Sequence, residues 1–265
     1  MNKDINYKIV NPGGNITALV NGLEFSAKER EEINNRILEI NKEVEQVGFI
    51  EYKQNRLEMA GGEFCMNATR CTIWELLKGK TGELSITVSG YKSSINGGIK
   101  NNRVYANLKI EQDLSDLVNE EKEYSIVNLD GITLVVIDED KSKESIKRLK
   151  EDENKAKDEL KEFMKNIKTD EKAVGVILLE KENNKLKINP VIWVKEIDTL
   201  YYESACGSGS LAAAIYKYTK SKTEDISIMQ PSGYSIDIEL DAKDEYIFGA
   251  CVTGEIVSVE EKILY

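Results

Sequence analysis

The chain has 265 residues, with 47 acidic against 36 basic side chains, a formal net charge of −11 and no histidine. An acidic surface repels phosphate backbones, which argues against nucleic acid as a partner. Without histidine there is no Ser–His–Asp triad, Cys–His dyad or His-ligated metal. Proton transfer near neutral pH therefore falls to Cys, Asp, Glu, Lys or Tyr side chains with shifted pKa values.

Short apolar runs between turn residues predict a chain dominated by β-strands, with few helices. In chain order we expect strands over 7–10 and 16–20, a helix over 27–46, strands over 47–52 and 54–59, a helix over 67–78, and strands over 84–88 and 104–110. The acidic stretch 111–123 separates these from strands over 125–128 and 133–137, a charged surface helix over 143–168, strands over 173–179 and 187–193, a helix over 208–220, and strands over 226–230, 234–240 and 246–252.

The sequence also bears on where in the cell the protein is found and on whether it binds a metal. No apolar stretch is long enough to cross a bilayer and residues 1–14 hold no secretory signal, so we expect a cytoplasmic protein without membrane contacts. The four cysteines, Cys65, Cys71, Cys206 and Cys251, form no CxxC pair. We expect free thiols and no metal site.

Two segments stand out for their chemistry, residues 60–71 and 203–212. In each, a cysteine (Cys65 and Cys206) directly precedes a short apolar helix. The free N–H groups at a helix N-terminus lower the pKa of a thiol and can also hold a carboxylate. The pattern therefore predicts two reactive thiols and an anion site.

The pairing of these segments suggests a reaction. If the halves of the chain face each other, a carboxylate can lie between the two helix starts, with one cysteine on either side of its α-carbon. One thiolate would then remove the α-proton while the opposite thiol returns a proton, as in a two-base racemase without a cofactor. Backbone N–H groups around the carboxylate would stabilise the carbanion.

The motifs also resemble a known family. Cys65-Met66-Asn67, Ala205-Cys206-Gly207-Ser208-Gly209, an early Gly13-Gly14-Asn15 and a late Gly233 are similar to motifs of the diaminopimelate epimerase family of PLP-independent amino-acid racemases and epimerases. The resemblance covers nearly the whole chain. It implies that Cys65 and Cys206 are catalytic, and that the substrate site comprises Asn15, Met66, Asn67, Glu203, Gly207 and Ser208. Asn15 and Asn67 could instead be plain turn or cap residues, and Glu203 could bind the substrate amino group or cap its loop.

The same resemblance implies an α+β fold of two pseudo-symmetric domains, each a curled, mostly antiparallel sheet around a central helix. We expect residues 1–118 to form the first domain and residues 119–253 the second. Residues 254–265 would return to the first domain as its last strand. A homodimer is a further expectation from relatives.

Departures from the family pattern bear on the substrate. The glycine that follows the first cysteine in the family is Met66 here, which reshapes the pocket. The arginine that grips a distal carboxylate is missing, because the ungapped positions hold Ile197 and Asp198 and residues 195–202 contain no arginine. A buried distal carboxylate would be left unpaired. We therefore expect an amino acid with a basic or polar side chain, histidine above all, and the chain looks most like the histidine-racemase branch.

Three alternatives remain open from the sequence. The chain could be a diaminopimelate epimerase that tolerates the altered distal site, or a non-catalytic amino-acid binding protein of the same fold. A disulfide between Cys65 and Cys206 could also form as a redox switch, which we interpret as a route to inactivation.

Overall fold

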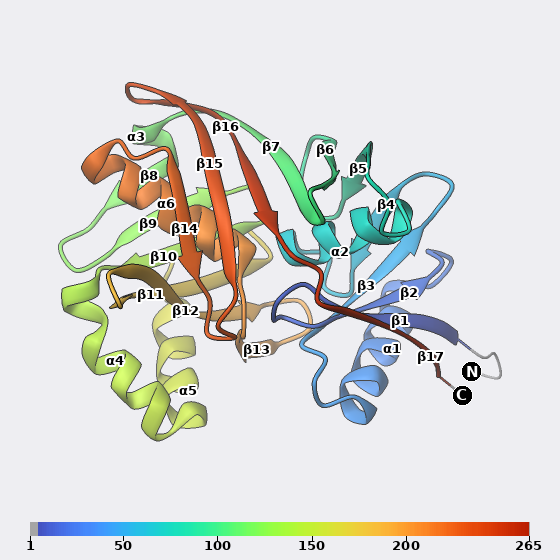
Figure 1. Cartoon of the computed structure of the whole chain (residues 1–265). Coiled ribbons are helices and arrows are strands. Elements are labelled where there is room, and N and C mark those ends of the chain that lie inside the picture. Colours follow the sequence, from blue (N-terminus) through green and yellow to red (C-terminus); the bar gives the residue numbers. More distant parts are fainter. Residues whose placement is uncertain (1–4, 265) are drawn as a thin grey trace.

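The computed structural model describes residues 5–264, which fold into two lobes built mainly of strands (Figure 1). The first lobe holds β1 (Ile5–Asn11), β2 (Thr17–Asn21), α1 (Ala27–Ile40), β3 (Gln46–Glu51), β4 (Arg56–Met59), α2 (Met66–Leu76), β5 (Gly82–Val88), β6 (Ile95–Lys100) and β7 (Arg103–Asp113). There follow α3 (Leu114–Leu117), β8 (Val118–Glu120), β9 (Ser125–Leu129), β10 (Ile132–Ile137), α4 (Glu139–Glu151), α5 (Glu153–Met164), β11 (Ala173–Glu182), β12 (Lys185–Val194), β13 (Thr199–Tyr202), α6 (Gly207–Ser221), β14 (Asp225–Met229), β15 (Ser235–Lys243), β16 (Tyr246–Gly254) and β17 (Ser258–Leu264). The predicted α+β class is confirmed.

Each lobe is wrapped around one central helix, as expected. Helix α2 contacts β2, β5, β6 and β7, while α6 contacts β9, β10, β11, β12, β15 and β16. Most of α2 is buried, and α6 is buried without a break from Gly207 to Tyr216. A helix that is enclosed on all sides needs no polar face, which explains the apolar composition of both segments.

The two lobes are joined through one strand pair. Strand β7 of the first lobe pairs antiparallel with β16 of the second, from Val104 opposite Gly254 to Asp113 opposite Tyr246. The chain then crosses back, and β17 pairs antiparallel with β1 along its whole length. Figure 1 shows this last strand, in dark red, beside the blue β1. The proposed limits at residues 118 and 253 remain a prediction.

The helix predicted over 27–46 is too long. Helix α1 ends at Ile40 because Asn41 leaves the helical conformation (φ −123°, ψ 91°) and its side chain donates a hydrogen bond to the Ile37 carbonyl. An asparagine that satisfies a terminal carbonyl in this way ends a helix locally. The apolar spacing that continues to Val44 belongs to the turn that follows, and Gln46 begins β3.

The helix predicted over 143–168 is in fact two helices. It begins earlier, at Glu139, and breaks at Asp152, which closes α4 and caps α5 by accepting the N–H of Lys155 at 3.1 Å. Aspartate is a strong N-cap residue, so the break has a local cause. Both helices lie on the outer side of the second lobe (Figure 1).

Strands β6, β8 and β13 were not predicted. In β6, Gly97 and Gly98 interrupt the alternation of apolar and polar residues. A methyl group at Gly97 would lie 2.5 Å from Cδ1 of Ile73, so this glycine lets α2 pack directly on the strand. Within residues 5–264, no helix is long and apolar enough to cross a membrane.

Candidate active site

Both central helices begin with a cysteine as the N-cap residue. The backbone at Cys65 is extended (φ −131°, ψ 113°), and its Sγ accepts the N–H of Ala68 at 3.4 Å. Cys206 has nearly the same conformation (φ −139°, ψ 108°), and its Sγ accepts the N–H of Gly209 at 3.3 Å. The same cysteine N-cap thus occurs once in each lobe, and each sulfur lies over the first turn of its helix.

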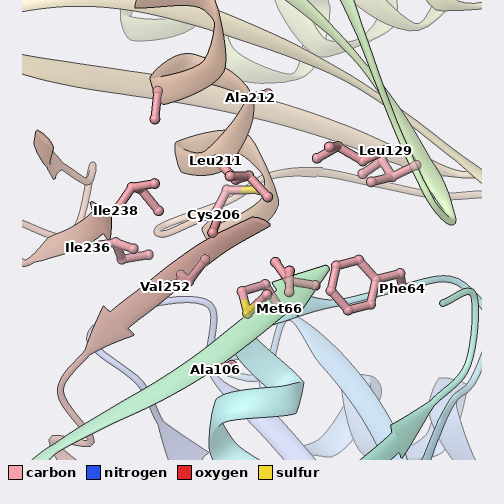
Figure 2. Close-up of a cluster of buried hydrophobic side chains, with 14 of the residues drawn as sticks. Phe64, Met66, Ala106, Leu129, Cys206, Leu211, Ala212, Ile236, Ile238 and Val252 are labelled. Carbon is pink, nitrogen blue, oxygen red and sulfur yellow. The ribbon is translucent and has the colours of Figure 1, made fainter. Parts of the chain in front are cut away.

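The starts of α2 and α6 meet at the junction of the lobes. A methyl group added to Gly207 would lie 2.7 Å from Cγ and 2.8 Å from Cβ of Met66, so only glycine fits there. The Asn67 amide donates a hydrogen bond across the junction to the Ala205 carbonyl at 3.0 Å. Figure 2 shows Met66 and Phe64 of the first lobe close to Cys206 and Leu211 of the second.

The two cysteines line one cavity at this junction. Every residue assigned to the site from the sequence lines it: Asn15, Cys65, Met66, Asn67, Glu203, Cys206, Gly207 and Ser208. Its volume is about 30 Å³, against about 150 Å³ for an engineered cavity that holds benzene. The cavity as it stands is therefore too small for an amino acid such as histidine. We call this arrangement the closed form, and we expect the lobes to separate when a substrate enters.

Two glutamines hold the cysteines and were not assigned to the site from the sequence. The Cys65 thiol donates to Oε1 of Gln46 at 2.9 Å, and Gln46 in turn donates to Thr17 Oγ1. In the second lobe, Oε1 of Gln230 accepts the backbone N–H of Cys206 at 2.9 Å. The first was missed because the helix prediction extended over residue 46. Gln230 carries no local signal, since it reaches the site only through the fold of the second lobe.

Buried carboxyl groups give the cavity its electrostatic character. Burial raises the pKa of Glu203 to about 8 and that of Glu63 to about 7. One carboxyl oxygen of each residue, and Oδ1 of Asn15, are buried without a hydrogen-bond partner among residues 5–264. Buried polar atoms normally have partners, so these atoms are available to a ligand. Glu63 was not assigned from the sequence, although it lies in the segment 60–71.

The expected lowering of the thiol pKa values is not found. Burial, followed by the charge of Glu203, raises the pKa of Cys65, and the same two causes raise the pKa of Cys206. The N–H groups of Ala68 and Gly209 oppose these effects without overcoming them. The sequence argument is wrong for this closed form because it counted the helix N-terminus and not the desolvation of the sulfur.

A second small cavity adjoins the first and shares Gln46, Glu63, Ile192, Val194 and Glu203 with it. Its remaining lining includes Glu45, Ile197 and Tyr201. Among the described residues, no lysine or arginine lines either cavity. Asp198, one of the ungapped positions of the family's missing arginine, lies on the surface. Its carboxylate pairs with Lys161 and accepts the Trp193 indole N–H.

A two-lobed fold with a cysteine at the start of each central helix, both lining one cavity, defines an isomerase of the amino-acid racemase and epimerase class. Residues 4–265 match the family model described as "Histidine racemase CntK N-terminal domain", so the chain belongs to this family.

Individual relatives agree with this assignment. A histidine racemase of Fusobacterium nucleatum is 29% identical over 253 residues, which cover 91% of each chain. A histidine racemase of Staphylococcus aureus is 26% identical over 96% of this chain and 95% of its own. The crystal structure of a hydroxyproline epimerase from Agrobacterium vitis, with bound trans-4-hydroxy-L-proline, gives a TM-score of 0.64 over 99% of this chain and 93% of its own. At 11% identity this last likeness shows the fold alone.

Proposed function

We propose that this enzyme racemises histidine, or an amino acid with a similar cationic side chain, with Cys65 and Cys206 as the two acid–base groups and without a cofactor. The observation that carries the proposal is the shared cavity, into which each lobe contributes one N-cap cysteine. Two thiols on different lobes can address opposite faces of one α-carbon. A single base cannot invert a stereocentre by this route.

The helix starts suit the α-carboxylate. The backbone N–H groups of Met66 and Asn67 in α2, and of Gly207 and Ser208 in α6, stand in the first turns, where a helix has no internal acceptor for them. All four residues line the cavity. Donors fixed in this way would bind the carboxylate and stabilise the charge that develops when the α-proton leaves.

The acidic lining favours a cationic substrate. Glu203 and Glu63 border the first cavity, and both of them with Glu45 border the second. These carboxyl groups can accept hydrogen bonds from the substrate ammonium group and from a protonated imidazole. A distal carboxylate, as in diaminopimelate, would meet the same acidic groups and, among the described residues, no lining cation.

The proton steps balance between the two thiols. The substrate's positive charge would favour the ionised form of the neighbouring carboxyl groups. One such carboxylate would then take the proton of one thiol, which becomes a thiolate. The thiolate takes the α-proton and becomes a thiol, while the opposite thiol gives up its proton and becomes the thiolate. The two roles are then exchanged for the reverse reaction.

Isotope exchange tests the proposal. In D₂O the enzyme should incorporate deuterium at the α-carbon of L-histidine and form D-histidine, measured by proton NMR and chiral chromatography. L-Lysine, L-arginine and LL-diaminopimelate serve as competing substrates, and diaminopimelate should not react. Cys65→Ser and Cys206→Ser should each abolish racemisation, because a serine hydroxyl is a much weaker acid than a thiol. Cys251→Ser is the matched control, since Cys251 lies in β16 outside the lining of the cavity.

Each other outcome has a distinct meaning. Binding of histidine without exchange would indicate an amino-acid binding protein, and turnover of diaminopimelate alone would indicate the epimerase. Full activity in either catalytic cysteine variant would refute the two-thiol mechanism. Recovery of activity after treatment with a reductant, together with a linked Cys65–Cys206 peptide pair in mass spectrometry of the oxidised enzyme, would show that a disulfide between the two cysteines inactivates the enzyme. The expected homodimer remains a prediction that sedimentation can test.

A further inference from the structure

Arg70 is a buried cation that the proposed reaction does not use. It lies in the second turn of α2 and its side chain is completely buried. No carboxylate of residues 5–264 forms an ion pair with it, and its Nε and Nη1 groups have no hydrogen-bond partner among these residues. Burial lowers the pKa of Arg70 to about 10, so it keeps its charge at neutral pH. A buried charge without a partner is costly.

Among residues 5–264, the guanidinium makes one hydrogen bond, and its partner Asn67 lies at the junction of the lobes. Nη2 of Arg70 donates to Oδ1 of Asn67 at 2.8 Å, and Nδ2 of Asn67 donates to the Ala205 carbonyl at 3.0 Å. Ala205 directly precedes Cys206. These three residues therefore form a continuous connection from the interior of α2 to the segment that carries the second cysteine.

The chemistry of these groups fixes the orientation of the Asn67 amide. A guanidinium has donors only, so the amide must turn its oxygen toward Arg70 and its NH₂ group toward Ala205. Turned the other way, the amide would place NH₂ against guanidinium and oxygen against the Ala205 carbonyl. Without Arg70, the Ala205 carbonyl alone would select this orientation, and the contact between the lobes weakens.

The position of Arg70 is sterically defined as well. A methyl group added to Gly254, at the end of β16, would lie 2.0 Å from Nη1. The strand that joins the second lobe to the first therefore passes directly over the guanidinium. A side chain at position 254 would therefore displace the guanidinium.

We propose that Arg70 is a positioning residue, which orients Asn67 so that the Cys65 segment and the Cys206 segment are locked together when the site is closed. The role rests on the proposed two-cysteine site. Arg70 itself touches no reacting atom.

The four cysteines of the chain provide a test that needs no catalytic activity. Cys65 and Cys206 report on the site, Cys71 is buried in the core beside Arg70, and Cys251 is half-buried in β16. Arg70→Met keeps an apolar side chain of similar length but removes the donor and the charge. Arg70→Lys keeps a donor and the charge. Alkylation by iodoacetamide is followed at each cysteine by mass spectrometry of its peptide.

In Arg70→Met we expect Cys206 and Cys65 to be alkylated about tenfold faster than in the unchanged protein, the effect of losing roughly one hydrogen bond. Cys71 should stay protected and Cys251 should react at an unchanged rate. The midpoint of urea unfolding should stay the same or rise, because the variant also removes an unpaired buried charge. Arg70→Lys should restore most of the protection.

Two results would overturn the proposal. If Cys71 becomes reactive in parallel with Cys206, Arg70 only supports the fold of the first lobe. If no cysteine changes its rate, the connection through Asn67 does not hold the lobes together. Alkylation is measured without substrate, so this test does not depend on racemase activity. If the proposed function is wrong, the absence of isotope exchange will show it separately.

Discussion

The contact between Gly207 and Met66 makes a sharp prediction about how the two lobes fit. In Gly207→Ala the new methyl carbon would lie 2.7 Å from Cγ and 2.8 Å from Cβ of Met66, about 1 Å less than an optimal carbon–carbon distance. Met66 is 1% exposed, and its Cβ is fixed by the backbone of α2, so rotation of the side chain alone cannot relieve the contact. We expect the substitution to lower the free energy of unfolding by about 1–3 kcal/mol and to reduce racemase turnover, since the two segments that carry Cys65 and Cys206 would shift.

A double-mutant cycle isolates this contact. Met66→Gly removes both offending carbons, at a cost of about 2–5 kcal/mol for the space it leaves. Gly207→Ala should then cost much less, because its methyl group enters that space and only Oδ1 of Asn67, at 3.1 Å, remains close to it. The expected coupling energy is about 1–3 kcal/mol in favour of the double variant. Met66→Ala is the matched control. It removes Cγ and keeps Cβ at 2.8 Å, so it should give a clearly smaller coupling energy.

The assay is urea unfolding of all five variants and the unchanged protein, followed by circular dichroism and tryptophan fluorescence. Trp74 in α2 and Trp193 in β12 place one fluorescent probe in each lobe. If the effects of Met66→Gly and Gly207→Ala add to within about 0.5 kcal/mol, the two helix starts are not in the contact described here. Equal coupling energies for Met66→Gly and Met66→Ala would show that the contact with Cβ of Met66 does not destabilise Gly207→Ala.

Two further predictions concern pH and helix capping. The raised pKa values of Glu203 and Glu63, about 8 and about 7, mean that the folded chain holds protons which the unfolded chain releases near pH 4.5. The free energy of unfolding should therefore fall by a few kcal/mol as pH rises from about 4.5 to about 8. The chain has no histidine that would titrate in this pH range. Glu203→Gln should flatten the dependence in urea titrations, and an unchanged slope would contradict the assignment. Asp152→Ala should cost about 1 kcal/mol through loss of the α5 cap, with turnover unchanged, because α5 lies outside the site. A drop in turnover would connect the outer helices to catalysis.

The sequence by itself determined the features that depend on neighbouring residues. A cysteine followed by small residues and a short apolar helix defines an N-cap over a few positions, so Cys65, Cys206 and the residues beside them could be assigned without the fold. The central helices and most strands were predictable for the same reason, and the misplaced helix ends fell where single residues, Asn41 and Asp152, act as caps. The assignment of Asn15 to the substrate site came from the resemblance of Gly13-Gly14-Asn15 to a family motif.

The tertiary structure alone decided the environment of those residues. Gln46 and Gln230 reach the cysteines from distant parts of the chain, and no local pattern marks them. The direction of the thiol pKa shifts was likewise beyond the sequence. A helix N-terminus is a local property, but desolvation and the field of Glu203 arise only when the lobes close around the sulfur atoms. Local sequence preferences thus placed the two thiols at helix N-termini, and long-range packing determined the direction of their pKa shifts.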